Sequence, residues 1–175
     1  MRSALPVVLD ACVLIPMPLA DTLLRLAAGP RLFLPKWSDQ IMVEVTRTLR
    51  ETFGLSAQKA MYRESEIRQH FPEAWIEDYE KSIPTMTNHP KDRHVLAAAA
   101  HTGAKAIGTY NIKDFPRSSL TPYSITVQGP SALSQGSLYC GAGNGNADVG
   151  RSSRCYRQVN AIFALQAPGQ RTSVR

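Results

Sequence analysis

The sequence lacks a long apolar run, and its 175 residues include only three cysteines. A helix needs about 20 consecutive apolar residues to cross a bilayer, so no membrane partner is expected. The apolar part of MRSALPVVLD is short and ends at an acid, without a small-residue cleavage site, which argues against a signal peptide. An odd number of cysteines without close metal-ligand spacing favours free thiols in a reducing cytoplasm over a disulfide framework.

Acidic residues are scarce at the C-terminal end. Residues 129–175 contain five arginines and a single acid, Asp148, and most of the glycines. Most of the net charge of +6 therefore lies there, so the basic composition is no argument that the rest binds nucleic acid. The segment has no helical or strand periodicity and predicts coil from residue 129 onward.

We therefore expect one domain over residues 1–130 and a poorly ordered Gly/Ser/Arg-rich tail over residues 131–175. Deletion of residues 132–175 should then change the melting temperature by only a few degrees. A shifted reading frame, an acquired extension or a basic arm that touches RNA would each explain the change of composition.

Apolar periodicity and helix end signals predict strands that alternate with helices. The expected strands are 5–10, 31–37, 104–110 and 124–128, the expected helices are 18–29, 39–54, 57–71 and 91–103, and residues 73–83 begin strand-like and end irregularly. This alternation predicts a three-layer α/β/α sandwich with a central parallel sheet. Ligands bind such sheets outside the carboxyl ends of the strands.

Several oxygen ligands fall at those ends. Asp10 ends the first strand, Glu44 lies early in a helix, Asp92 opens another helix, and Asn111 and Asp114 follow the strand 104–110. Burial of an unpaired carboxylate costs several kcal/mol, and clustered carboxylates repel one another. A hard cation such as Mg²⁺ or Mn²⁺ relieves that repulsion. Taken singly, Asp92 could be a helix-terminus charge, Glu44 a solvated acid and Asp114 a turn residue, so only the set indicates a site.

Four segments together carry a family resemblance. In order and spacing, VVLDACVLI, WSDQIMVEVTRTL, NHPKDRHVLAAAAHTGA and AIGTYNIKDFP resemble the PIN-domain family, most closely its prokaryotic branch of VapC-type toxins. The resemblance covers about residues 5–128. It implies an Mg²⁺- or Mn²⁺-dependent endoribonuclease that cuts single-stranded RNA in the cytoplasm, with a cognate antitoxin as protein partner. Whether the chain also forms a homodimer is left open.

The resemblance also assigns roles to residues. The family's carboxylates match Asp10, Glu44 and Asp92, and its fourth position is often an aspartate where this chain has Asn111. Asn is a neutral oxygen ligand, and Asp114 three residues later is expected to compensate, directly or through water. The expected catalytic residues are Asp10, Glu44, Asp92 and Asp114, the expected metal ligands are Asp10, Asp92, Asn111 and Asp114, Thr109 supports the site, and Lys91, Arg93 and Lys113 are candidate phosphate contacts.

Other functions compete with this interpretation. A phosphatase with an aspartyl nucleophile generally needs a second acid two residues after it, where this chain has Cys12. A PIN-like fold that has lost catalysis and only binds protein or RNA is kept open by Asn111. His89 and His94 suggest zinc, but no third nitrogen or sulfur ligand is suitably spaced.

Overall fold

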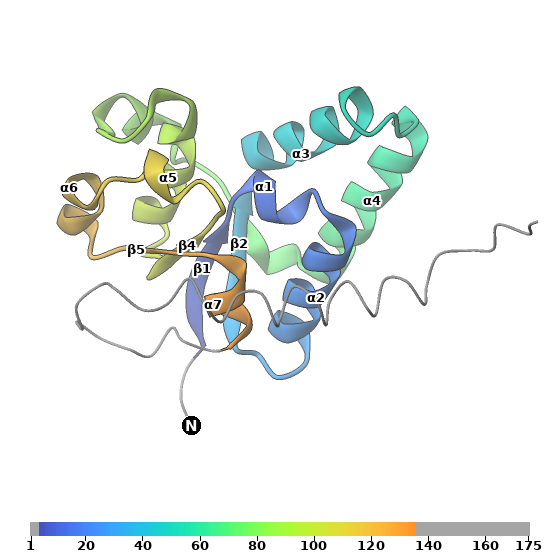
Figure 1. Ribbon diagram of the computed structural model, residues 1–175, viewed down its shortest axis with the longest axis horizontal. Helices are drawn as coiled ribbons and strands as arrows, with labels where there is room; N and C mark the ends of the chain where they lie inside the picture. Colours follow the sequence, from blue (N-terminus) through green and yellow to red (C-terminus); the bar gives the residue numbers. More distant parts are fainter. Residues whose placement is uncertain (1–3, 136–175) are drawn as a thin grey trace, which may run out of the picture. The chain divides into compact units, whose positions relative to one another are not determined.

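The protein is described by a computed structural model, which covers residues 4–135 (Figure 1). Five parallel strands form one sheet in the order β3-β2-β1-β4-β5. The strands are β1 (Leu5–Leu9), β2 (Phe33–Ser38), β3 (Trp75–Ile76), β4 (Ala106–Gly108) and β5 (Thr126–Gln128). The predicted parallel sheet is confirmed, although β4 is shorter than the expected strand 104–110.

Helices cover both faces of this sheet. The α-helices are α1 (Ala11–Leu14), α2 (Met17–Ala28), α3 (Asp39–Glu51), α4 (Ala57–His70), α5 (Arg93–His101), α6 (Arg117–Leu120) and α7 (Pro130–Ser134). Short 3-10 helices are η1 (Pro72–Ala74), η2 (Glu80–Thr85), η3 (Pro90–Asp92), η4 (Ile112–Asp114) and η5 (Thr121–Tyr123). Helix α5 packs against β1, β2 and β4, while α1, α2 and α7 lie on the opposite face (Figure 1). The arrangement is the three-layer α/β/α fold that the alternation predicted.

Local signals in the sequence set most helix ends. Ser38 caps α3 by accepting a hydrogen bond from Ile41 N at 3.3 Å, and Ser56 caps α4 by accepting one from Lys59 N at 3.3 Å. Gly103 follows α5 with a φ of 62°, a left-handed conformation that glycine adopts without strain. The helices predicted over 39–54, 57–71 and 91–103 therefore occur with slightly shifted ends.

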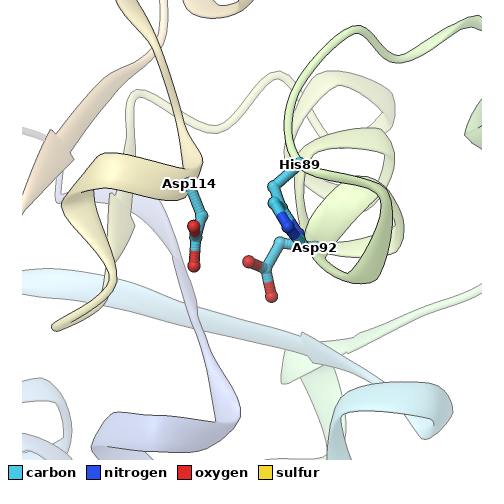
Figure 2. Close-up of side chains that lie close together, drawn as sticks. All are labelled: His89, Asp92 and Asp114. Atoms are coloured by element: carbon cyan, nitrogen blue, oxygen red, sulfur yellow. The ribbon is translucent and has the colours of Figure 1, made fainter.

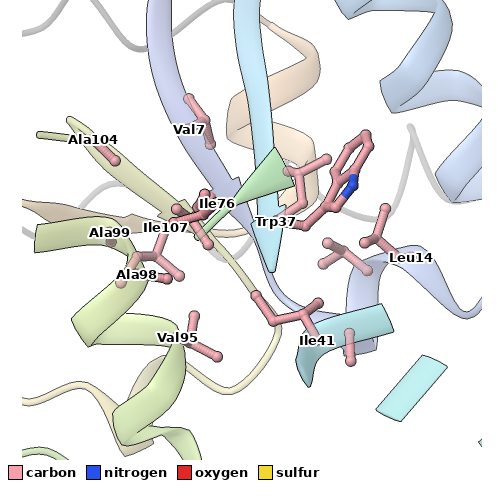
Figure 3. Close-up of a cluster of buried hydrophobic side chains, with 14 of the residues drawn as sticks. Val7, Leu14, Trp37, Ile41, Ile76, Val95, Ala98, Ala99, Ala104 and Ile107 are labelled. Atoms are coloured by element: carbon pink, nitrogen blue, oxygen red, sulfur yellow. The ribbon is translucent and has the colours of Figure 1, made fainter. Parts of the chain in front are cut away.

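One apolar core joins the layers. Figure 3 shows side chains from β1, β2, α3, α5 and β4 meeting around the sheet, among them Val7, Trp37, Ile41, Val95 and Ile107. All five are fully buried, and each contributes roughly 1.5–3 kcal/mol to stability by leaving water. The packed sheet fixes the positions of the carboxyl ends of its strands. It therefore also fixes the positions of the polar residues that follow those strands.

The coil prediction from residue 129 onward is wrong for residues 130–134, which form α7. Pro130 suits the first helical position, and Leu133 is 0% exposed. Leu133 packs over Gly108, where an added Cβ would lie only 2.5 Å from Leu133 Cδ1. Deletion of residues 132–175 would remove this buried leucine, so the expectation of a small change in melting temperature no longer holds. The rest of the predicted tail lies outside the described residues.

A second difference lies directly after the first strand. The run PVVLDACVLIP is apolar enough for a continuous strand, yet β1 ends at Leu9 and residues 11–14 form the helical turn α1. Asp10 is the residue at this change of direction. Within residues 4–135, no helix has the length and apolar character needed to span a membrane.

Candidate functional site

Asp10 lies at the carboxyl end of the central strand of the sheet. Its backbone N–H donates to Gly108 O at 3.0 Å, so Asp10 sits beside Thr109 at the end of β4. The residue is 3% exposed. Its Oδ2 accepts hydrogen bonds from Thr109 Oγ1 at 2.6 Å and from Cys12 Sγ at 3.1 Å. One oxygen of this buried carboxylate is therefore held by two donors from different elements.

The residues around Asp10 hold one another as well. Tyr110 N donates to Cys12 Sγ at 3.3 Å, and Asn111 N donates to Thr109 Oγ1 at 2.9 Å. Burial, followed by the Asp10 charge, raises the pKa of the Cys12 thiol to about 12, so the thiol keeps its proton. Thr109 Oγ1 therefore links the Asp10 carboxylate to the backbone N–H of Asn111.

A second group lies where η3 and η4 approach each other (Figure 2). One ligand atom each from His89, Asp92 and Asp114 lie within 4.8 Å of one another. The backbone joins these residues, because Asp92 N donates to His89 O at 2.9 Å and His89 N donates to Asp114 O at 3.0 Å. Figure 2 shows the two carboxylates facing each other with the imidazole beside Asp92. Two acids expected from sequence are thus brought together with a histidine that was not.

Asp92 is in an unfavourable place for a charge. Burial, followed by the Asp10 charge, raises the pKa of Asp92 to about 7. Among residues 4–135, no hydrogen-bond donor reaches its buried Oδ2. Asp114 differs, because a hydrogen bond from Lys91 holds the pKa of its carboxyl below the usual value. Of the two facing carboxyls, Asp92 is therefore the more readily protonated.

Lys91 is the cation nearest to this pair. Its Nζ lies 3.0 Å from Asp114 Oδ2 and 3.9 Å from Asp92 Oδ2. The hydrogen bond to Asp114 is the largest cause of a raised Lys91 pKa, and the charges of Asp92 and Asp10 add to it. The Lys91 charge also acts on Glu44, where it opposes part of the rise in the Glu44 pKa. One lysine thus interacts electrostatically with all four acids of the predicted catalytic set.

Glu44 projects from α3 and meets a buried histidine. Burial and then the Asp10 charge raise the pKa of Glu44, and Arg47 and Lys91 partly oppose the rise. His94 Nε2 lies 3.4 Å from Glu44 Oε1 and has no hydrogen-bond partner among the described residues. Burial lowers the pKa of His94, although the Asp10 charge and a hydrogen bond to the Lys91 carbonyl raise it. His94 therefore faces Glu44 and not the group of His89, Asp92 and Asp114.

The donor set suits a divalent cation. The buried Asp92 Oδ2 has no hydrogen-bond partner in the described part of the chain, and a carboxylate and an imidazole lie beside it. Carboxylate oxygens suit Mg²⁺ and Mn²⁺, while an imidazole nitrogen favours Mn²⁺ or a later metal. His89 was missed as a ligand because its spacing was weighed only for zinc. Its position three residues before Asp92, in the turn NHPKD, was the available signal.

Comparisons with known proteins give a partial match. The chain is similar to the protein named "Putative ribonuclease VapC50" of Mycobacterium tuberculosis, with 48% identity over 63 residues. The matched segment is 35% of this chain and spans 37% of that relative. No family model matches the chain, and no solved structure matches it. Over the matched segment, this similarity agrees with the resemblance that the sequence motifs carry.

Proposed function

We propose that the protein is a metal-dependent endoribonuclease that cuts single-stranded RNA and is the toxin of a toxin–antitoxin pair. The observation that carries the proposal is the buried Asp92 Oδ2, which has no hydrogen-bond partner within residues 4–135 and lies in the group with His89 and Asp114. Burial and then the Asp10 charge raise the pKa of this carboxyl. Such an oxygen is costly to keep unless a ligand completes it. The likeness to a protein named as a ribonuclease supports RNA as the substrate and an antitoxin as the protein partner.

The acids divide into two roles in this proposal. Asp92 and Asp114 would hold Mg²⁺ or Mn²⁺ together with His89, and Asp10 and Asn111 keep their predicted places as further oxygen ligands. When bound, the cation supplies charge that activates a water molecule and neutralises the phosphate. The Asp114 carboxylate replaces the charge that Asn111 lacks.

The remaining polar residues orient and move protons. Thr109 and Cys12 donate hydrogen bonds to Asp10 Oδ2 and so fix the position of the Asp10 carboxylate, which would supply negative charge to the cation. Glu44, with a raised pKa and His94 beside it, is placed to accept a proton from the attacking water. In-line attack on the phosphodiester then leaves a 5′-phosphate and a 3′-hydroxyl.

The alternatives fit the geometry less well. An aspartyl phosphatase needs an acid two residues after its nucleophile, and Cys12 there is a thiol with a pKa of about 12 that donates to Asp10 itself. A module that binds without catalysis gains nothing from the unfavourable burial of Asp92. Neither alternative explains why Asp10, Glu44, Asp92 and Asp114 share one electrostatic field.

The direct test is RNA cleavage by purified protein. With Mg²⁺ or Mn²⁺ the protein should cut a single-stranded RNA, and EDTA should stop the cut. An Asp92→Asn variant purified in parallel controls for contaminating nucleases and should be inactive. Cleavage that continues in EDTA, or an equally active Asp92→Asn preparation, would remove the proposed mechanism.

A further inference from the structure

Lys91 is placed where a cation between the two facing carboxylates would bind. Its ammonium lies 3.0 Å from Asp114 Oδ2 and 3.9 Å from Asp92 Oδ2. These belong to the same two residues that, with His89, form the group suited to a metal. The Lys91 side chain is 57% exposed, whereas those of its partners are 23% and 8% exposed. A solvent-facing positive charge thus lies against two carboxyl groups that are much less accessible.

We infer that Lys91 is an internal counter-ion of the site, which an entering divalent cation displaces from Asp92 and Asp114. The inference rests on the proposed function for the identity of the site. Lys91 and the metal then compete for the same two carboxylates. The metal therefore binds less tightly than it would to the carboxylates without Lys91.

Charge and geometry require the displacement. An ammonium and a divalent cation on the same two carboxylates would lie within a few ångströms of each other, where like charges repel strongly. The lysine stem is flexible and mostly in water, so the ammonium leaves at little cost. Asp114 cannot withdraw as easily, because its backbone carbonyl accepts from His89 N at 3.0 Å and its N–H donates to Asn111 O at 3.0 Å.

Other nearby cations lack this placement. Arg93 Nε donates to the backbone carbonyl of Asn88 at 3.4 Å. Lys113 directly precedes Asp114 and is exposed, yet within residues 4–135 no carboxylate lies within ion-pair distance of it. Lys113 therefore provides a matched control, because its removal deletes a positive charge next to Asp114 in the sequence and keeps the contacts of Lys91 with Asp92 and Asp114.

Released from the carboxylates, the Lys91 ammonium is available to an RNA phosphate. Loss of Lys91 should therefore have opposite effects on two measurements: tighter metal binding and weaker RNA binding. A residue with a merely structural role would weaken both, since a loosened site holds neither ligand well.

The experiment measures Mn²⁺ binding by calorimetry to the full chain and to three variants: Lys91→Met, Lys91→Arg and Lys113→Met. We expect Lys91→Met to bind Mn²⁺ on the order of three- to tenfold more tightly, as the loss of one partly exposed ion-pair partner implies. Lys91→Arg and Lys113→Met should stay within about twofold of the unmodified chain. Melting in EDTA adds a metal-free measurement: Lys91→Met should melt lower than the unmodified chain, and saturating Mn²⁺ should bring the two together.

Equal or weaker Mn²⁺ binding by Lys91→Met would overturn the inference. Equal tightening by Lys113→Met would also overturn it, because the effect would then belong to the general field and not to displacement. If the unmodified chain binds no Mn²⁺, both this inference and the proposed function fail. If the Lys91 effect is present but RNA is not cut, the counter-ion role stands and the proposed function alone falls.

Discussion

Asp10 and Asp92 are almost equally buried, at 3% and 6% exposed, but their surroundings differ in kind. At the carboxyl ends of β1 and β4, Asp10 Oδ2 accepts hydrogen bonds from Thr109 and Cys12. Between η3 and η4, Asp92 Oδ2 has no hydrogen-bond donor within the described residues, and the Asp92 pKa rises to about 7. Hydrogen bonds from the chain therefore stabilise the Asp10 carboxylate, whereas burial favours the protonated form of Asp92.

Asp10 and the pair of Asp92 and Asp114 differ in how the chain holds them in place. Regular strands hold Asp10, and its charge raises the pKa of both Glu44 and Asp92. Asp92 and Asp114 come from short 3-10 turns, where Lys91 Nζ lies 3.0 Å from Asp114 Oδ2 and 3.9 Å from Asp92 Oδ2. The sheet therefore fixes the position of Asp10, whereas the positions of Asp92 and Asp114 depend on two short turns.

The largest expected effect comes from removing the charge of Asp10. Asp10→Asn should lower RNA cleavage by about 100-fold or more, because charge stabilisation at the site is lost. The metal-free fold should stay as stable or become more stable, because an amide oxygen still accepts from Thr109 while the repulsion on Asp92 falls. Cleavage assays and thermal melts in EDTA on the same variant check both statements.

Lower stability with unchanged cleavage in Asp10→Asn would contradict the distinction between Asp10 and Asp92. If Asp10 were only a satisfied structural group, Asp10→Asn would cost roughly 1–3 kcal/mol of stability and leave cleavage intact. A destabilised, fully active variant would place the active site elsewhere.

A smaller effect is expected from the support of Asp10. Thr109→Val keeps the side-chain shape but removes the donor at 2.6 Å from Asp10 Oδ2, leaving Cys12 as a weak donor. We expect a loss of about 1–3 kcal/mol in the free energy of unfolding, with cleavage reduced roughly 10- to 100-fold. Urea unfolding and initial cleavage rates measure the two quantities.

The exposed Thr126 gives a matched control for Thr109, since its hydroxyl donates only to Lys105 O at the other end of β4. Thr126→Val should change stability by no more than about 0.5 kcal/mol and leave cleavage unchanged. An equal loss of stability and cleavage in both variants would mean that the hydrogen bond to Asp10 contributes no more than an exposed hydrogen bond does.

The smallest effect is a pH dependence that belongs to Asp92. Its pKa is about 7 in the folded chain against 3.8 for an ordinary aspartate, so the folded state binds the proton more tightly than the unfolded state. The contribution of Asp92 to the free energy of unfolding is therefore greatest below about pH 4, and it is lost as the pH rises to about 7. In EDTA at pH 8, Asp92→Asn should be about 1–2 kcal/mol more stable than the unmodified chain, since the depressed Asp114 pKa offsets part of the effect.

Melts between pH 5 and pH 8 test this prediction. The stability difference between Asp92→Asn and the unmodified chain should grow through that range. A difference that is constant with pH would show that Asp92 keeps one protonation state throughout this range, against its raised pKa.

Much of this arrangement follows from the sequence. Caps at Ser38 and Ser56 and glycine stops set the helices, and alternation set the parallel sheet. Since parallel strands end at one edge, Asp10 and Thr109 had to meet there. The approach of Asp92 to Asp114 was expected because Asp92 opens a helix and Asp114 follows the strand 104–110 at the same edge of the sheet.

The remaining features depend on contacts between distant segments. Leu133 becomes a helical core residue because Gly108 leaves room for it, and no local pattern in a Gly/Ser-rich stretch indicates that. The place of His89 depends on a backbone hydrogen bond to Asp114, and the role of Cys12 depends on Thr109, 97 residues away. Such contacts require the fold itself.

The central claim is that Asp92 exchanges its proton for a divalent cation, and proton release on metal binding tests it most directly. Calorimetric titration of the full chain with Mn²⁺ at pH 7.0, in two buffers of different ionisation enthalpy, counts the protons released per ion. With a pKa of about 7, Asp92 is about half protonated at that pH, so the account predicts release of about half a proton. At pH 9 the release should approach zero. Metal binding at pH 7.0 without any proton release, or no metal binding at all, would contradict the account.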